Sequence, residues 1–290
     1  MKRDATITWA SGEGFFNQPG FEVYIQSILR SGFEGDKLIF TTDIPEKWRE
    51  RLNQLGFNIV TVNPQIIEVV VRDRFLAYWM YLAENAERYR YIIATDARDV
   101  IFQRNPIPYL SAKFLPHSDF VLLTSEGMKH CESDWNMRDQ YGCQKNVKRF
   151  VKDYRNWPVI NGGIQLGTAK QLKDFFFTLW SATLMTNGEC TDQGVLNYIL
   201  SFLEKDPNIF IDNPAKSVLC ATGEVIKNKL MDPMPLFENH QVINSNTMET
   251  YILYHQWDRT SHAEELQKHY IAQDQGPKSV FPHLFQDKEA

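Results

Sequence analysis

The stretch YIIATDARDVIFQRNP, residues 91–106, places two aspartates within an otherwise apolar, strand-like run. Asp96 and Asp99 follow apolar or small residues, and Val100 and Ile101 then resume the apolar pattern. Ionised Asp is rarely buried without a partner, so the chain either leaves the core here or holds a cation. Residues three apart in a strand point to opposite faces, so both carboxylates can serve one ion only if the chain turns after Thr95.

Two interpretations of this pair of aspartates are open. A hard divalent cation such as Mn²⁺ or Mg²⁺ prefers oxygen ligands, and one or two carboxylates completed by water and substrate phosphate are sufficient to hold it. Alternatively, the two carboxylates pair with Arg90, Arg98 or Arg104 in a solvated turn. The surrounding sequence has to decide between them.

The surrounding chain alternates strand-like and helix-like segments up to about residue 124. Strands are predicted at 5–10, 37–42, 57–62, 91–96 and 119–125, and helices at 21–30, 44–56 and 73–88. This alternation predicts an α/β fold with a mainly parallel, Rossmann-like sheet covered by helices on both faces. Ligands of such sheets bind beyond the carboxyl ends of the strands, where Asp96 and Asp99 would lie.

The second half of the chain is less regular. Residues 125–158 are polar and aromatic without a clear period, which is typical of a lid or insertion. A strand is predicted at 159–167, followed by helices at 169–185 and 191–205, and the remainder is predicted to be irregular. No repeat or low-complexity linker divides the 290 residues, which favours a single domain.

The composition excludes several classes of function. The 31 basic and 36 acidic residues give a net charge of −5, which offers no general footprint for nucleic acid or an anionic membrane. There is no apolar run of about 18 residues and no signal-peptide pattern at the start, so we expect no membrane span and a cytoplasmic location.

The four cysteines, Cys131, Cys143, Cys190 and Cys220, form no CxxC pair. This spacing indicates neither a zinc knuckle nor a dense disulfide framework. We expect reduced, partly buried thiols.

Two further motifs carry polar groups that suit a ligand. In NGGIQLG, residues 161–167, adjacent glycines mark either a close approach of the backbone to a ligand or a simple bulge, and Asn161 is suited to binding sugar hydroxyls. In TDQGVLN, Asp192 and Gln193 open a helix, where an Asp is favoured by the helix dipole whether or not it faces a ligand.

The last motif is YHQWDR, in which His255 follows an apolar run and precedes Asp258 and Arg259. A lone His is more often structural than a metal ligand. Here it completes a set of four motifs along an α/β chain, and the order of the four is more informative than any one of them.

This order resembles the GT-A fold glycosyltransferases that use nucleotide sugars, particularly the glycogenin-like and family-eight galactosyltransferase group. In that group a strand ends in an Asp-x-Asp metal motif, followed by an Asn-x-Gly strand, an Asp-Gln helix start and a C-terminal His. DARD, NGGIQLG, TDQGVLN and HQWDR match these motifs, and the resemblance spans roughly residues 5–260. The chain also looks like the small stand-alone glycosyltransferases of large DNA viruses of algae, which include a xylosyltransferase.

The resemblance implies an enzyme that uses Mn²⁺ or Mg²⁺ to move a sugar, with xylose the best guess, from a UDP-sugar to a glycan or glycoprotein hydroxyl. Asp99 and His255 would bind the metal, with Asp96 beside them. Asp192 or Asp73 would act as general base in an inverting reaction. The implied donor-binding residues are Thr8, Trp9, Ala10, Arg72, Arg74, Asp96, Ala97, Arg98, Asn161, Gly162, Gly163, Gln193 and Arg259. The implied division is a nucleotide-binding half (1–124), a lid (125–158), an acceptor and metal-completing half (159–260) and a tail (261–290).

Departures from the family pattern keep alternatives open. The metal motif holds one extra residue, and the HxxGxxKPW pattern of family eight is absent, with Arg259 in place of its Lys. A retaining reaction therefore remains open, as does a carbohydrate-binding protein without catalysis. A sugar nucleotidyltransferase is less consistent, because WASGEGFFNQPG after the first strand lacks the basic residue that its phosphate loop would need.

Overall fold

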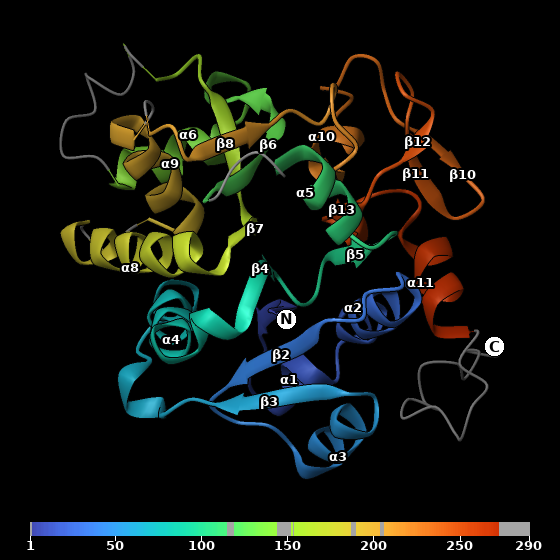
Figure 1. Cartoon of the computed structure of the whole chain (residues 1–290). Coiled ribbons are helices and arrows are strands. Elements are labelled where there is room, and N and C mark those ends of the chain that lie inside the picture. Colours follow the sequence, from blue (N-terminus) through green and yellow to red (C-terminus); the bar gives the residue numbers. More distant parts are fainter. Residues whose placement is uncertain are drawn as a thin grey trace, which may run out of the picture.

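The computed structural model describes residues 2–114, 119–143, 152, 154–186, 190–203 and 206–272. Its centre is a seven-stranded sheet (Figure 1). In spatial order the strands are β3 (Phe57–Thr61), β2 (Asp36–Thr41), β1 (Arg3–Trp9), β4 (Tyr89–Thr95), β7 (Pro158–Thr168), β6 (Val121–Lys129) and β8 (Ile209–Asp212). Only β7 runs against the other six, so the sheet is mainly parallel.

The strands send alternate side chains into two hydrophobic layers, as expected for strands buried on both faces. In β4, Ile93 packs into one layer, while Ile92 and Ala94 pack into the other. The first layer is completed by α1 (Glu13–Phe16), α2 (Pro19–Arg30), α3 (Glu46–Gln54) and α5 (Ile107–Phe114). The second is completed by α4 (Val70–Asn85), α8 (Ala169–Met185) and α9 (Asp192–Leu203). The predicted sheet with helices on both faces is confirmed.

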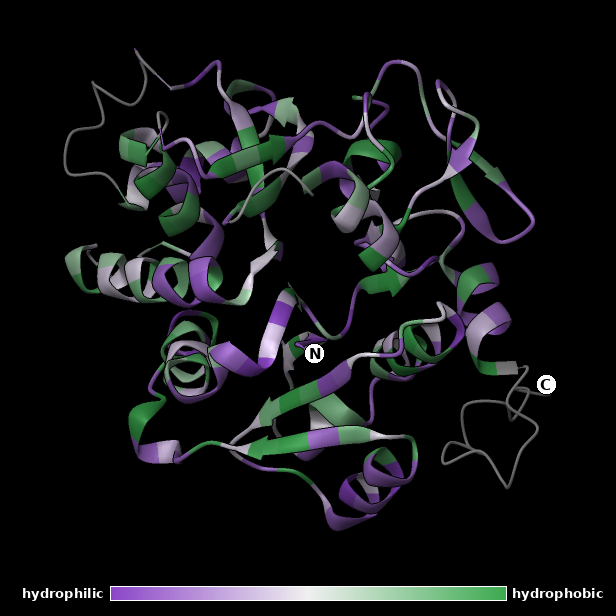
Figure 2. Cartoon of the chain, viewed as in Figure 1, coloured by the Kyte–Doolittle hydropathy of each residue, from purple (hydrophilic) through white to green (hydrophobic). Residues whose placement is uncertain are grey.

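Hydropathy separates the sheet from its covering helices. Figure 2 shows β2 and β3 as mostly hydrophobic and α3 as mostly hydrophilic. In α3 only Trp48 and Leu52 are buried, because this short helix touches the sheet with one face and leaves the rest in solvent.

A second, three-stranded sheet brings distant parts of the chain together. It is formed by β5 (Val100–Phe102), β13 (Leu253–His255) and β9 (Cys220–Thr222), with β13 in the middle. Strand β13 is antiparallel to β5, and the register pairs His255 with Val100. This pairing carries a residue from near the end of the described chain to the position next to Asp99.

The region after residue 205 is more regular than predicted. Besides β8, β9 and β13, it contains α10 (Gly223–Lys227), a small sheet of β10 (Leu236–Glu238), β11 (Gln241–Asn244) and β12 (Glu249–Thr250), and α11 (Ala263–Ala272). Helix α11 packs beside α2, where Arg30 donates hydrogen bonds to the carbonyls of His269 and Tyr270. The prediction of an irregular tail was wrong for 206–272, and residues 273–290 lie outside the described residues.

The segment predicted as a lid, 125–158, also contains regular structure. Its start extends β6 to Lys129, and α6 (Asp134–Cys143) follows after a short 3₁₀ turn. Residues 144–151 and 153 lie outside the described residues. Because Asp139 accepts hydrogen bonds from the backbone N–H and hydroxyl of Thr191, α6 is fixed to the start of α9.

The structure corrects the prediction of four reduced thiols. Cys143 at the end of α6 is joined by a disulfide to Cys190, while Cys131 and Cys220 are free. No periodic pattern in the sequence relates these two positions, which are 47 residues apart. Among the described helices, none is long and apolar enough to cross a membrane.

Candidate functional site

Two strand registers assemble an acidic cluster at the carboxyl end of β4. Strand β4 ends at Thr95 and the chain turns, with the backbone N–H of Asp96 donating to the carbonyl of Gly163 in β7 at 2.9 Å. On the other side the backbone N–H of Gln256 donates to the carbonyl of Asp99 at 2.6 Å, which fixes β13 against the same turn. The turn that a common metal site requires after Thr95 is therefore present.

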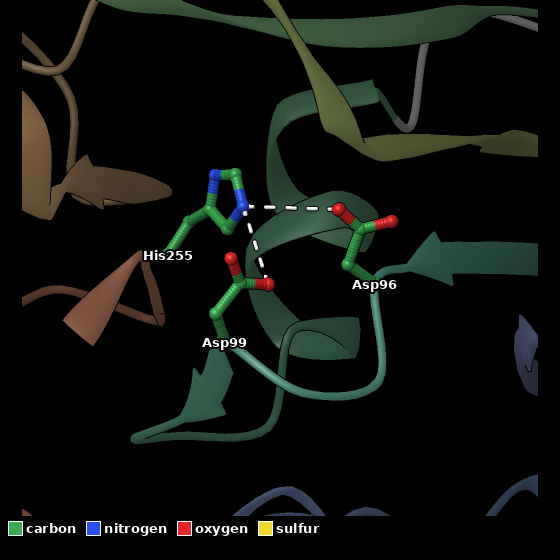
Figure 3. A group of neighbouring side chains, drawn as sticks. All are labelled: Asp96, Asp99 and His255. Atoms are coloured by element: carbon green, nitrogen blue, oxygen red, sulfur yellow. Dashed lines mark ion pairs between the residues drawn. The ribbon is translucent and has the colours of Figure 1, made fainter. Parts of the chain in front are cut away.

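Asp96, Asp99 and His255 converge in this cluster (Figure 3). Nε2 of His255 lies 3.6 Å from Oδ1 of Asp99 and 3.9 Å from Oδ2 of Asp96. One ligand atom from each residue falls within 4.8 Å of the others, a spacing that a single divalent cation can bridge. Asp99 and His255 are buried, whereas Asp96 is partly exposed.

The electrostatics of the cluster favour positive charge. Burial by itself would raise the pKa of Asp99, but His255, Arg98 and Arg259 outweigh burial and hold that pKa below its usual range. Burial would lower the pKa of His255, yet the neighbouring carboxylates, Asp99 foremost, raise it. A cation at Nε2 would take the place of the proton that these carboxylates attract.

Gly163 leaves room for such a cation. A Cβ at this position would lie 2.8 Å from Oδ2 of Asp96 and 2.9 Å from Nε2 of His255, closer than real Cβ atoms approach. The space beside the ligand atoms is therefore kept free by the lack of a side chain. Two carboxylates and one imidazole suit Mn²⁺, and Mg²⁺ is compatible with the oxygen ligands, so the residues present fit the predicted divalent metal.

The acidic cluster lies between two cavities, each of about 450 to 460 Å³. The first, which we call the arginine cavity, is lined by Trp9, Phe15, Arg74, Ala97, Arg98 and Arg259 together with Asp96 and Asp99. Arg98 donates to Asp99 at 3.2 Å, and Arg259 lies 3.8 Å from the same carboxylate. Nε1 of Trp9 is buried and finds no acceptor within the described part of the chain, so this indole N–H is available to a ligand.

The second, which we call the amide cavity, has a different lining. It shares Val71, Asp96, Asp99 and Arg259 with the first, and its other lining residues include Glu126, Asn136, Gly162, Gly163, Asp192 and Gln193. Amides and carboxylates predominate here, and these groups donate to and accept from hydroxyls. The two cavities together form one cleft with the acidic cluster at its centre.

Arg74, on α4, links the cluster to the start of α9. Its guanidinium donates to Asp96 at 2.5 Å, to Asp192, and to the carbonyl of Gly162 at 3.4 Å. Burial raises the pKa of Asp192, an effect that Arg74 opposes. The planar guanidinium of Arg74 therefore holds both Asp96 and Asp192 in fixed positions in the cleft.

Glu126, in β6, orders the amides of the second cavity and was missed by the sequence analysis. One carboxylate oxygen accepts hydrogen bonds from Asn161 and Gln193, each at 3.1 Å, and the other accepts from Asn136 at 3.5 Å. The amide oxygens of Asn161 and Gln193 in turn accept from the backbone N–H groups of Gly163 and Gly162. A lone Glu in the segment TSEG carries no spacing signal that could have indicated this role.

Several predicted donor-binding residues do not line the cleft. Thr8 is buried and donates to the carbonyl of Thr95, Ala10 is fully buried, and Arg72 is absent from the lining of both cavities. Asn161 has no exposed surface and supports the glycines from behind, so it would not contact a sugar directly. In contrast, Trp9, Arg74, Ala97, Arg98, Gly162, Gly163, Gln193 and Arg259 all line one or both cavities.

Asp73, predicted to open a helix, lies inside the first turn of α4, which begins earlier than expected. Its carboxylate reaches back to accept hydrogen bonds from the backbone N–H groups of Glu68 at 2.8 Å and Val69 at 2.7 Å. Asp73 is nearly buried and lines neither cavity. These contacts give Asp73 a helix-capping role.

The sequence matches no protein-family profile and no curated protein. Solved structures, however, match along almost the whole chain. A galactosyltransferase LgtC in complex with donor and acceptor sugar analogs has a TM-score of 0.58 at 14% identity and covers 94% of this chain and 98% of its own. The chain has a GT-A fold.

Two further structures agree with this assignment. An active-site mutant of LgtC matches with a TM-score of 0.59 at 11% identity, covering 96% of this chain and 98% of its own. The apo form of the glycosyltransferase GlyE of Streptococcus pneumoniae gives 0.53 at 13% identity, covering 93% and 60%. At such identities these similarities establish the fold and leave the activity to be argued from the cleft itself.

Proposed function

We propose that this protein is a metal-dependent glycosyltransferase that moves a sugar from a UDP-sugar to a glycan hydroxyl. The observation that carries the proposal is the position of the acidic cluster. Asp96, Asp99 and His255 lie where a cavity with three arginines meets a cavity of amides and carboxylates. A sugar nucleotide has the same division, with an anionic diphosphate between its nucleoside and its hydroxyl-rich sugar.

The arginine cavity would hold the nucleoside diphosphate. Arg98 and Arg259 are positioned to make charge-assisted hydrogen bonds to phosphate oxygens, and the free indole N–H of Trp9 is positioned to bind the base. Asp99, His255 and Asp96 would hold Mn²⁺ or Mg²⁺, which supplies charge neutralisation for the departing diphosphate. The uridine base and the sugar, xylose in the first instance, are proposed from the sequence resemblance.

The amide cavity would hold the donor sugar next to its acceptor. Gly162 and Gly163 let the sugar approach the backbone closely, and Gln193 and Asp192 border the same space. During transfer the bond between the anomeric carbon and the phosphate oxygen breaks, and the acceptor oxygen bonds to that carbon. The acceptor proton passes to a base of the protein or to the departing phosphate.

Inversion with Asp192 or Asp73 as base is the mechanism that the sequence predicts. We propose Asp192 for this role, because it lines the amide cavity, whereas Asp73 lines neither cavity and its carboxylate accepts from the backbone N–H groups of Glu68 and Val69. One observation favours retention as the second candidate. Both oxygens of Asp192 are already bound, one by Arg74 and the other by the backbone N–H of Gln193. A carboxylate held in this way is suited to orienting a donor sugar.

The proposal is tested by incubating the protein with UDP-xylose, UDP-glucose, UDP-galactose and UDP-N-acetylglucosamine plus Mn²⁺, and measuring UDP release with and without glycan acceptors. We expect cleavage of at least one donor and its loss in EDTA. NMR of the product's anomeric proton then assigns inversion or retention.

Asp99→Asn and His255→Ala should each lower UDP release by at least about 10²-fold and weaken Mn²⁺ binding measured by calorimetry. Asp174→Asn, which changes an exposed carboxylate on α8, is the matched control and should behave as wild type. Normal turnover by both site variants in EDTA would refute the metal site. Donor binding with no cleavage of any donor would instead identify a carbohydrate-binding protein.

A further inference from the structure

The outer wall of the amide cavity carries an exposed aromatic side chain. Trp135, near the start of α6, lines this cavity and keeps 49% of its surface exposed. Trp9, the tryptophan of the arginine cavity, is only 6% exposed. A large aromatic ring exposed to this degree in the lining of a cavity is accessible to a bound ligand.

A continuous series of contacts leads from the acidic cluster to this ring. Gly163 adjoins Asp96 and His255, and the backbone N–H of its neighbour Gly162 donates to Gln193 at 2.9 Å. Gln193 donates to the side-chain oxygen of Asn136 at 2.9 Å, and Asn136 is the residue next to Trp135. Trp135 therefore lines the amide cavity from α6, past Gln193 in this series of contacts and outside the lining of the arginine cavity.

Polar groups line the same cavity as the ring. The hydroxyl oxygen of Ser133 accepts from the backbone N–H of Asn136 at 3.2 Å and from its side chain at 3.0 Å, and its O–H meets no acceptor within the described residues. Glu224, in the first turn of α10, also lines the cavity with a partly exposed carboxylate. An aromatic face with a donor and an acceptor nearby suits a pyranose, because the C–H groups of its flatter face pack on the electron-rich ring while its hydroxyls point outward.

We propose that Trp135, with Ser133 and Glu224, forms the acceptor subsite and binds a terminal pyranose of a glycan by stacking. This proposal rests on the proposed glycosyl transfer and specifies its acceptor. The cavity has the volume of pockets that hold drug-sized ligands, and two adjacent sugar rings are of that size. Because the ring lies past Gln193 and outside the lining of the arginine cavity, we expect acceptor binding, and not donor cleavage, to depend on it.

The test compares Trp135→Ala and Trp135→Phe with wild type. UDP release without acceptor reports donor cleavage, and transfer to a panel of methyl hexopyranosides and methyl pentopyranosides reports the acceptor KM. We expect Trp135→Ala to raise the acceptor KM by roughly five- to tenfold, Trp135→Phe to recover most of the loss, and both to cleave donor within about twofold of wild type. Tyr141→Ala removes another exposed aromatic side chain of α6, outside the lining of the cavity. This control should leave donor cleavage and the acceptor KM unchanged.

Each other outcome has a defined meaning. An unchanged acceptor KM in Trp135→Ala overturns the acceptor subsite, and so does an equal loss of donor cleavage, since the residue would then serve the donor or the fold. Donor cleavage by wild type without transfer to any glycoside of the panel overturns a pyranose acceptor. Absence of donor cleavage in wild type contradicts the proposed function itself, which separates the two failures.

Discussion

The arginine cavity and the amide cavity have nearly equal volumes and share the acidic cluster, but they are built from different chemistry. In the first, two of the arginines are partly exposed cations, with the side chains of Arg98 and Arg259 about 40% exposed, while Arg74 is buried. In the second, amides and carboxylates are buried and bound to one another around Glu126. A strongly anionic ligand tolerates adjustable partners, whereas uncharged hydroxyls need donors and acceptors that are fixed in advance.

Predicted residues line both cavities, but the contribution of α6 to the second cavity was not predicted. Trp9 is the last residue of β1, and Ala97 and Arg98 follow the end of β4, where a parallel sheet places its ligands, so their positions follow from topology alone. The wall of the second cavity comes from α6, which was predicted to be irregular and lies far along the chain from its partners in α9. Such contacts depend on packing between segments and leave no periodic signal.

The largest effect that separates the cavities is expected from Gly163→Ala. The new Cβ would displace Asp96 and His255 from one another, and a shift of about 1 Å at a reacting centre can cost about 10²-fold in rate. We expect UDP release to fall by at least that factor, with Mn²⁺ affinity measured by calorimetry falling in parallel.

Gly14→Ala, in α1 beside Phe15 of the arginine cavity, is the matched control. A Cβ there meets nothing within 4 Å, so activity should be unchanged and the helix slightly stabilised. Wild-type Mn²⁺ affinity in Gly163→Ala would show that the cation is held elsewhere.

A smaller effect, on stability, is expected from breaking the disulfide between Cys143 and Cys190. It ties α6 to the residue that precedes Thr191 and Asp192, so it closes the wall of the amide cavity only. Replacing both cysteines by alanine should lower the free energy of unfolding by about 2–4 kcal/mol, measured by urea denaturation. Cys131→Ala, at a free thiol, is the control, and equal stabilities for both variants would contradict the link.

Glu126→Gln tests whether the amide cavity is fixed in advance. Three side-chain amides now donate to the two oxygens of the Glu126 carboxylate. A glutamine replaces one of these oxygens by an N–H₂ group, so at least one buried donor loses its acceptor. This should lower the free energy of unfolding by about 1–3 kcal/mol. Thermal denaturation measures the loss. The KM for the donor sugar should rise. Binding of UDP alone, which we propose to occupy the arginine cavity, should remain at the wild-type level. Weaker UDP binding would argue against two separately built cavities.

The fold was predictable from the sequence, and the acidic cluster nearly so. Alternation of strands and helices fixed the sheet, and Asp96, Asp99 and His255 were identified from motif order. Burial was not predictable for polar residues such as Asn161 and Thr8, because strand registers decide which side of a cleft a side chain faces. Asp73 illustrates the same difficulty, since α4 starts three residues earlier than predicted and the Asp73 carboxylate accepts from the backbone N–H of Val69.

The smallest expected effect concerns His130, a buried residue in the 3₁₀ turn before α6. Burial lowers the pKa of His130 to about 4, with an opposing hydrogen bond to Asn197. In the unfolded chain this histidine has a pKa of about 6.5, so it takes up a proton at a higher pH than in the folded protein. The stability that neutral His130 contributes is therefore present above that pH and is lost as the pH falls toward 4. Between pH 7.5 and 5.5 the loss should be about 1 kcal/mol, and it should disappear in His130→Gln when urea denaturation is compared at the two pH values. Taking the difference between the two proteins cancels the titration of every other group. An equal loss in both would show that the turn before α6 does not bury a neutral imidazole.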